Sequence, residues 1–152
     1  MNLAIIIARK NSRRLKNKNL LKIGKYNLIQ LTLIEALKVR ELKKIIINTD
    51  IKNIRNYFKF LTKKQLNKII FMERKPHLSN DKAKAVSVVI DTIKRINNSK
   101  YSIVTLLLPT CPLRKARDIK LGIKKLNKEV STVISVNKSD FPPQFHFYKN
   151  KK

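Results

Sequence analysis

Glycine, cysteine and acidic residues are scarce in this sequence. It has two glycines, one cysteine, no tryptophan and nine acidic residues in 152 positions. Two glycines are too few for the glycine-rich phosphate loops of dinucleotide-binding and P-loop proteins. Any phosphate site must therefore rely on side chains and on the backbone of other residues.

The scarcity of cysteine and the absence of long hydrophobic runs argue against disulfide-bonded, secreted and membrane-spanning proteins. Because Cys111 is the only cysteine, no internal disulfide can form, and a reducing compartment is indicated. The opening apolar run, Leu3–Ala8, is too short for a signal-peptide core, and Arg9 and Lys10 follow it directly. No run approaches the length of a membrane span. We therefore expect a soluble, cytoplasmic protein without membrane contact.

The charge is strongly one-sided. Lysine and arginine total 36 against nine acidic residues, which gives a net charge of +27. Such a balance favours polyanionic partners such as nucleotides or nucleic acid. The lysines, however, are spread over the whole chain and accompanied by many isoleucines and asparagines, a bias that an AT-rich coding sequence produces. We therefore attribute most of the excess charge to this bias, and we find no cluster of acidic residues with metal-ligand spacing.

Short apolar runs alternate with helical patterns along one domain, residues 1–152. The hydrophobic fraction of 43% is enough for a core. Strands are expected at Leu3–Ala8, Lys44–Asn48, Lys68–Phe71, Tyr101–Leu108 and Val130–Val136. Helices are expected at 27–37 with Asn27 as the cap, after Asp50 as the cap, at 83–96, and after Arg114. This alternation predicts an α/β fold with three α/β/α layers and a mostly parallel sheet.

The loop Arg9–Asn19 follows the first expected strand and is the first candidate site. In such folds, ligands bind at the carboxyl ends of the strands. Arg9 stands at the strand end and Lys18 at the far end of the loop, while Asn11 and Ser12 offer turn-forming side chains and backbone N–H groups. Several cations and amides of this kind can bind a triphosphate. The alternative is an ordinary solvated basic loop.

Two more polar loops follow expected strands and should lie at the same edge. In residues 74–81, Asn80 or Asp81 is expected to cap the next helix. In residues 106–114, two prolines fix the backbone around Cys111. No histidine is placed to activate this thiol, so we interpret Cys111 as a packing residue.

Together these loops resemble the acylneuraminate cytidylyltransferases, the CMP-sialic acid synthetases. The first motif of that family resembles residues 8–19, which read ARKNSRRLKNKN. Its Ser-Thr-Asp resembles NTD at 48–50, and its third motif resembles RKPHLSND at 74–81, with the proline displaced by one. Its fourth motif resembles LLLPTCPLR at 106–114, and residues 132–136 with Pro142-Pro143 match the next block. The four motifs stand in family order and cover nearly the whole chain.

The resemblance implies a Rossmann-like nucleotidyltransferase fold and transfer of CMP from CTP to a nine-carbon acidic sugar, with Mg²⁺ as cofactor. It implies that Arg9 and Lys18 hold the triphosphate, and that Asn19 and Arg74 contact the cytosine and ribose. The other positions that it implies in substrate binding are Asn11, Ser12, Asp81, Leu108 and Thr110. Members of the family are commonly homodimers.

The sequence departs from the family pattern at three points. Leu108 stands where the family has a glutamine that is expected to contact the sugar, and Cys111 replaces a serine. Family members usually run about 70 residues further, and that part carries the Asp-x-Asp metal ligands, whose equivalents are not found here. Two alternatives therefore stay open: a nucleotide-binding remnant or subunit that is catalytically incomplete, and a basic nucleic-acid-binding domain. The even spread of the cations and the absence of a nucleic-acid-binding motif argue against the latter.

Overall fold

A parallel sheet of four strands forms the centre of the protein. The computed structural model describes residues 1–12, 15–96 and 101–136. The strands are β1 (Asn2–Ala8), β4 (Leu42–Thr49), β5 (Ile69–Glu73) and β6 (Ile103–Leu107), in the spatial order β5-β4-β1-β6. All three pairings in this sheet are parallel. The four carboxyl ends therefore meet at one edge, as the alternating pattern predicts.

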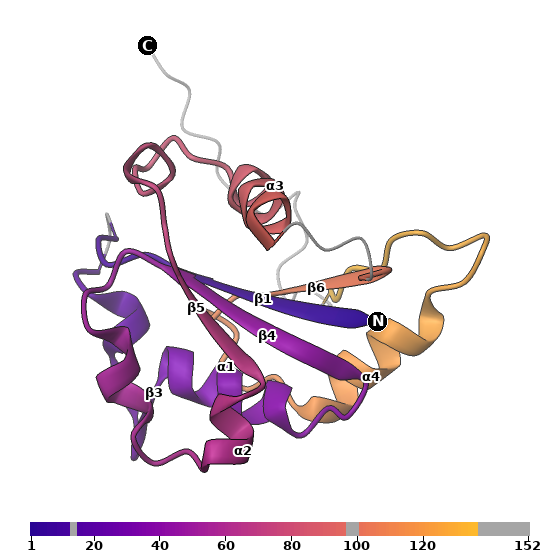
Figure 1. Ribbon diagram of the computed structural model, residues 1–152, viewed down its shortest axis with the longest axis horizontal. Coiled ribbons are helices and arrows are strands. Elements are labelled where there is room, and N and C mark those ends of the chain that lie inside the picture. The colour runs from indigo at the N-terminus through magenta and orange to yellow at the C-terminus, as the bar shows by residue number, and fades with distance from the viewer. Residues whose placement is uncertain (13–14, 97–100, 137–152) are drawn as a thin grey trace, which may run out of the picture.

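Helices cover both faces of the sheet (Figure 1). One face carries α1 (Leu28–Leu37), the 3-10 helix η2 (Ile54–Phe58), α2 (Lys63–Leu66) and α4 (Ala116–Lys125). The other face carries α3 (Ala85–Ile96). The shorter elements are η1 (Lys18–Leu20), β2 (Lys22–Ile23), β3 (Tyr26–Asn27) and η3 (Pro76–Leu78). The prediction of three α/β/α layers is confirmed.

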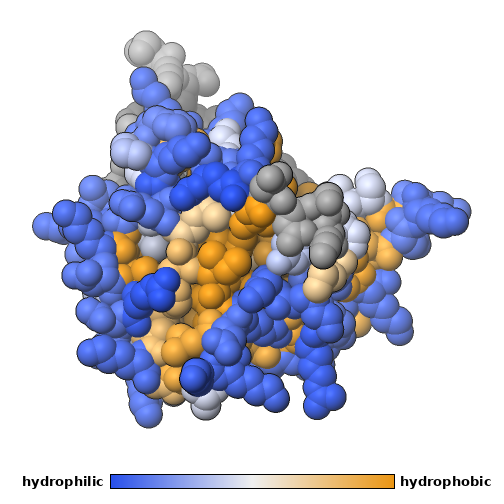
Figure 2. Space-filling view, viewed as in Figure 1, coloured by the Kyte–Doolittle hydropathy of each residue, from blue (hydrophilic) through white to orange (hydrophobic). Residues whose placement is uncertain are grey.

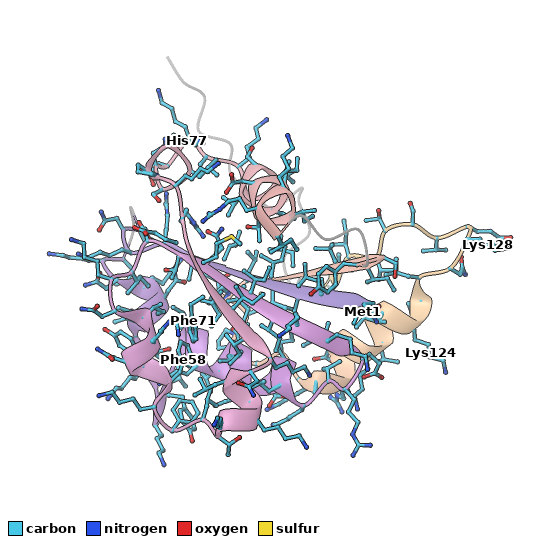
Figure 3. The ribbon with its side chains drawn as sticks, viewed as in Figure 1. Met1, Phe58, Phe71, His77, Lys124 and Lys128 are labelled. Atoms are coloured by element: carbon cyan, nitrogen blue, oxygen red, sulfur yellow. The ribbon has the colours of Figure 1, made fainter. Side chains whose placement is uncertain are left out.

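The middle segments of the two central strands, β1 and β4, are apolar because helices cover both faces of the sheet there. Along β1, Ala4 and Ile6 join the large cluster that includes α1, whereas Leu3 and Ile5 face the side of α3, and all four are fully buried. In the larger cluster, the rings of Phe58 and Phe71 lie 5.6 Å apart between centroids (Figure 3). Two-sided burial of this kind is typical of parallel sheets.

Helix α1 begins where the sequence predicts. The Asn27 side chain accepts a hydrogen bond from the Gln30 backbone N–H at 2.9 Å, and the Gln30 side chain accepts one from the Asn27 N–H at 2.8 Å. These reciprocal bonds satisfy two donors at the helix start. Just before it, Gly24 has φ of 59° in the turn between β2 and β3. That conformation favours glycine, so one of the two glycines is used for a short hairpin.

Two of the expected elements are wrong. Asp50 does not cap a helix, because its Oδ1 accepts a hydrogen bond from the Lys10 backbone N–H at 2.6 Å, and η2 starts only after Asn53. The expected strand Val130–Val136 has no regular structure, and Ile134 and Val136 are 76% and 84% exposed. An apolar pattern makes a strand only where a neighbouring strand pairs with it. Pro142-Pro143 lies outside the residues that the structure describes.

The surface is polar around most of its rim, and an apolar band lies over the middle of the face at the β5 edge (Figure 2). Among the helices of the described residues, none is long and apolar enough to cross a membrane.

Candidate functional site

A cavity of about 230 Å³ lies at the carboxyl ends of the strands. Three separate segments line it: the loop after β1, the segment between β5 and α3, and the loop after β6. Eight of the nine residues that the sequence singles out are among its lining residues, namely Arg9, Ser12, Lys18, Asn19, Arg74, Asp81, Leu108 and Thr110. Asn11 is exposed and is not one of them.

Arg9 lies at the end of β1 and reaches across to the segment that precedes α3. Its Nη1 lies 2.5 Å from Oδ1 of Asp81 and donates a hydrogen bond to the Asn80 carbonyl at 3.1 Å. Asp81 thus forms an ion pair with a cation of the cavity, and α3 begins only four residues later. Asn80 shapes the turn, because its Oδ1 accepts from the backbone N–H groups of Lys82 and Ala83.

The far end of the first loop is folded by a local turn. Asn17 has φ of 54°, a left-handed conformation that asparagine tolerates better than most residues. Its carbonyl accepts a hydrogen bond from Leu20 N–H at 2.8 Å, which closes η1. Asn19 is 6% exposed and its Nδ2 donates to the Arg9 carbonyl at 2.9 Å. Asn19 thus ties the two ends of the loop together and brings Lys18 to the cavity beside Arg9.

Arg74 follows β5 and is the most deeply buried cation of the cavity, with 6% of its surface exposed. Its Nε donates to Asn48 Oδ1 and its Nη2 donates to the Asn48 carbonyl, both at 3.0 Å. Burial lowers the pKa of Arg74, which the nearby Asp50 carboxylate opposes and Arg9 reinforces. Because the guanidinium of arginine is protonated in proteins at neutral pH, Arg74 stays charged.

The loop after β6 contributes less charge. Leu108 is 39% exposed, and its carbonyl accepts a hydrogen bond from Arg114 Nη2 at 3.0 Å. Thr110 also lines the cavity, while Cys111 is exposed and is not buried as a packing residue should be. The packing interpretation of Cys111 is therefore wrong. Pro109 and Pro112 on either side keep the chain in a turn, so the thiol faces solvent.

Several residues that build the site are not among those that the sequence singles out as site residues. Asn48 is fully buried and holds Arg74, and Asp50 holds the start of the first loop. Both belong to the NTD motif, but their partners lie 26 and 40 residues away in the chain. Thr92 on α3, which bonds to Asn48, carries no motif at all. Besides the NTD motif, a polar residue at the end of an otherwise apolar run is a signal that could mark Asn48.

The described part of the chain has no group of three or more histidine, cysteine or acidic side chains that could hold a metal ion. Of the two acids near the cavity, Asp81 pairs with Arg9, and Asp50 accepts from Lys10. Mg²⁺ needs several oxygen ligands in an octahedral arrangement. These residues therefore do not form a magnesium site by themselves.

The cavity therefore offers a positively charged binding site for an extended anion. Arg9, Lys18 and Arg74 come from three segments and line one cavity together with amide and hydroxyl groups. Charge-assisted hydrogen bonds of this kind are well suited to phosphate oxygens. The neighbouring apolar residues Ile7, Leu78 and Val88 give the cavity a surface on which a less polar part of a ligand can lie.

Comparison with known proteins supports the same conclusion. A model of the cytidylyltransferase family matches residues 3–144. The CMP-N,N'-diacetyllegionaminic acid synthase of Campylobacter jejuni is 32% identical over 93 residues, which cover 61% of this chain and 37% of that protein. The enzyme of the same name from Legionella pneumophila is 28% identical over 145 residues, which cover 94% of this chain and 60% of that protein. The chain therefore spans only part of the length of these relatives.

Solved structures show the same fold. A CMP:2-keto-3-deoxy-manno-octonic acid synthetase in complex with CTP superposes with a TM-score of 0.63 at 22% identity, over 81% of this chain and 46% of that one. A cytidylyltransferase from Leptospira borgpetersenii gives a TM-score of 0.59 at 21% identity, over 82% and 48% of the two chains. The expected Rossmann-like nucleotidyltransferase fold is confirmed. Because the family model covers nearly the whole sequence, the chain belongs to the cytidylyltransferase family.

Proposed function

We propose that this chain binds CTP in the cavity and takes part in transferring CMP to a nine-carbon acidic sugar, with release of pyrophosphate. The observation that carries this proposal is the convergence of Arg9, Lys18 and Arg74 on one cavity of a cytidylyltransferase fold. The names of the relatives favour a nonulosonic acid such as N,N'-diacetyllegionaminic acid as the acceptor.

The reaction needs little covalent chemistry from the protein. A hydroxyl oxygen of the sugar attacks the α-phosphorus of CTP, and a new P–O bond forms. The bond from the α-phosphorus to the bridging oxygen breaks, pyrophosphate leaves with that electron pair, and the hydroxyl proton passes to solvent. Catalysis of phosphoryl-type transfer rests on positioning and on stabilising negative charge.

The three cations have distinct parts in this proposal. Arg9 and Lys18 lie at the two ends of one loop, which suits them to the β- and γ-phosphates that become pyrophosphate. Arg74 and Asn19 lie deeper and are proposed to contact the nucleoside end. Asn11, Ser12, Asp81, Leu108 and Thr110 are proposed to complete the binding of the nucleotide and the sugar. Because Asp81 already pairs with Arg9, a bound triphosphate has to compete with this carboxylate.

Mg²⁺ remains part of the proposal as a cofactor of the nucleotide. The described residues do not supply its ligands, so no step is derived through it. The measurement that addresses it is a comparison of product formation with and without MgCl₂.

The first experiment measures nucleotide preference. The rise in melting temperature is recorded with CTP, UTP, ATP and inorganic polyphosphate, each at low and high salt. We expect the largest rise with CTP, and a moderate loss of this rise with salt. Equal stabilisation by every polyanion, with a steep loss on raising salt, would instead support a general basic binding domain.

The second experiment measures turnover. The protein is incubated with CTP and a panel of sialic, legionaminic and pseudaminic acids, and pyrophosphate and CMP-sugar are quantified together. Equal amounts of both products support the proposed transfer. CTP binding without either product would show that this chain binds the nucleotide but does not complete the reaction alone.

A further inference from the structure

Three polar residues lie buried where the sheet meets α3, next to the cavity. Asn48 and Thr92 have no exposed surface, and Arg74 is 6% exposed. Asn48 belongs to β4, Thr92 to α3, and Arg74 directly follows β5. Buried polar groups cost free energy unless they are hydrogen-bonded, so their partners have to be accounted for.

Their hydrogen bonds form a chain that runs in one direction. Arg74 Nε donates to Asn48 Oδ1 at 3.0 Å, and Asn48 Nδ2 donates to Thr92 Oγ1 at 2.9 Å. Thr92 Oγ1 in turn donates to the Val88 carbonyl at 2.7 Å. Because the Thr92 proton is committed to Val88, only a lone pair is left for Asn48. The Asn48 amide therefore has one orientation, with its oxygen toward Arg74.

This chain holds the guanidinium at one edge and leaves the other edge for the cavity. Nε and Nη2 of Arg74 are both bonded to Asn48, through the side-chain oxygen and the main-chain carbonyl. No hydrogen bond from Nη1 to a described residue is present, and Arg74 is a lining residue of the cavity. The Asn48 side chain thus fixes the plane of the guanidinium, which decides where Nη1 points.

The partner of Arg74 is neutral, in contrast to the partner of Arg9. Arg9 forms an ion pair with the Asp81 carboxylate, so part of its charge is already compensated. Arg74 donates its hydrogen bonds to an amide and a carbonyl and forms no ion pair with a described residue, although the Asp50 carboxylate lies near enough to act on its charge. A carboxylate at position 48 would hold the same guanidinium but cancel this charge. The residue type at position 48 therefore matters for binding as well as for packing.

We propose that Asn48, oriented by Thr92, is a positioning residue that holds the Arg74 guanidinium through neutral groups and presents it to the bound nucleotide. This inference rests on the proposed nucleotide site. Thr92 is not among the residues that line the cavity, so it acts only through Asn48. The contribution of both residues is to fix Arg74 before the ligand arrives, which lowers the entropic cost of binding.

The test compares two buried threonines, of which one accepts a hydrogen bond from Asn48 and the other does not. Thr92 and Thr32 are both buried in helices, and each donates its hydroxyl to the carbonyl four residues earlier. Only Thr92 also accepts from Asn48. The dissociation constant for CTP is measured by calorimetry for the wild type, Thr92→Val, Thr92→Ser and Thr32→Val, with the melting temperature of each.

We expect Thr92→Val to weaken CTP binding about threefold or more, as for residues that share one hydrogen-bond network. Thr92→Ser keeps the hydroxyl and should retain the affinity of the wild type. Thr32→Val should lower the melting temperature without changing the affinity. In the free protein, the ¹⁵N–¹H signal of the Arg74 Nε–H should shift in Thr92→Val and remain in place in Thr92→Ser.

A second variant keeps the proposal testable if Thr92→Val does not fold. Asn48→Asp preserves the size of the side chain and an acceptor for Arg74. We expect this variant to fold and to bind CTP at least about tenfold more weakly, because Arg74 would then form an ion pair with the new carboxylate. Undiminished affinity in Asn48→Asp would overturn the proposal.

Failure of the inference can be told apart from failure of the proposed function. If the wild type binds CTP and Thr92→Val binds it equally, the network only supports the core, and the positioning role is wrong. If the wild type does not bind CTP, the proposed function is wrong and the inference falls with it.

Discussion

The two edge strands of the sheet both end at the cavity, but their ends are built differently. After β5, Arg74 is buried and bonded to the neighbouring strand through its side chain. After β6, Leu108 is 39% exposed, and the chain there is held through its carbonyl by Arg114. At the β5 end the side chain of Arg74 makes the bonds, whereas at the β6 end the backbone carbonyl of Leu108 accepts them, from the Arg114 side chain and from the Cys111 N–H. Position 74 should therefore tolerate few substitutions, and the Leu108 side chain should be open to change.

The largest effect is expected for Arg74→Met at the β5 end. This substitution approximately keeps the length of the side chain and removes its charge. The Asn48 side chain would lose its charged donor inside the core. We expect the free energy of unfolding to fall by about 1.5–3 kcal/mol and CTP binding to weaken by a similar amount. Urea unfolding and calorimetry measure the two effects.

The control for this change is Arg117→Met on α4, whose side chain is 83% exposed. That substitution should alter the free energy of unfolding by no more than about 0.5 kcal/mol. If Arg74→Met behaves like Arg117→Met in both measurements, the bonds from Arg74 to Asn48 do not contribute to stability or to CTP binding.

Lys18→Ala removes a cation that lines the cavity and should affect binding alone. Lys18 is partly exposed and lies on η1, whose closing bonds are made by backbone groups. We expect CTP binding to weaken by about 1.5–3 kcal/mol, as for a lost charged hydrogen bond, with an unchanged melting temperature. Lys22→Ala, at an exposed position of β2 that does not line the cavity, is the matched control. An equal affinity in both variants would show that the first loop is ordinary solvated charge.

The layers and the sheet could be predicted because their signals are local. Each central strand is a continuous apolar run, and α1 carries its own cap in Asn27 and Gln30. The carboxyl ends of such strands must share one edge, so the three polar loops were expected together without knowledge of any contact. This is why eight of the nine chosen positions line one cavity.

The errors came from contacts that the sequence does not record. Asp50 stands where a helix cap would stand, but its carboxylate is bound by Lys10 from a loop 40 residues earlier. Residues 130–136 alternate like a strand, but no described strand pairs with them. Asn48 and Thr92 are 44 residues apart, and only the packing of α3 on the sheet brings them into contact.

The segment after β5 is also attached to α3 by an ion pair, which makes a pH-dependent contribution to the free energy of unfolding. Asp91 on α3 lies 2.6 Å from Lys75 and 3.4 Å from Arg95. The hydrogen bond from Lys75, more than the opposing effect of burial, lowers the pKa of Asp91 below its usual 3.8. A depressed carboxyl pKa stabilises the fold above the unfolded-state pKa, and this stabilisation is lost as the pH falls through the folded-state pKa.

Asp91→Asn should therefore lower the free energy of unfolding by about 1 kcal/mol at pH 7, a value near the upper end for exposed pairs. The difference from the wild type should shrink as the pH is lowered below about 4, where the unfolded-state carboxyl is protonated, and vanish once the folded-state carboxyl is protonated as well. Urea unfolding across this range measures it, with Glu129→Gln at an exposed position as the control. A difference that stays constant with pH would mean that the Asp91 carboxylate does not tie this segment to α3.

The smallest effect is expected at the β6 end, where Leu108→Gln introduces the residue type common in this family. Because Leu108 is 39% exposed, the free energy of unfolding should change by no more than about 0.5 kcal/mol. The new amide would lie at the cavity and could add one hydrogen bond to an acidic sugar, which corresponds to a gain of about 0.5–1 kcal/mol in affinity. Sugar binding in the presence of CTP measures this gain, and Leu108→Met controls for a change of shape without a new polar group. A large loss of stability in Leu108→Gln would place this side chain in the core, and both ends of the sheet would then be equally intolerant of change.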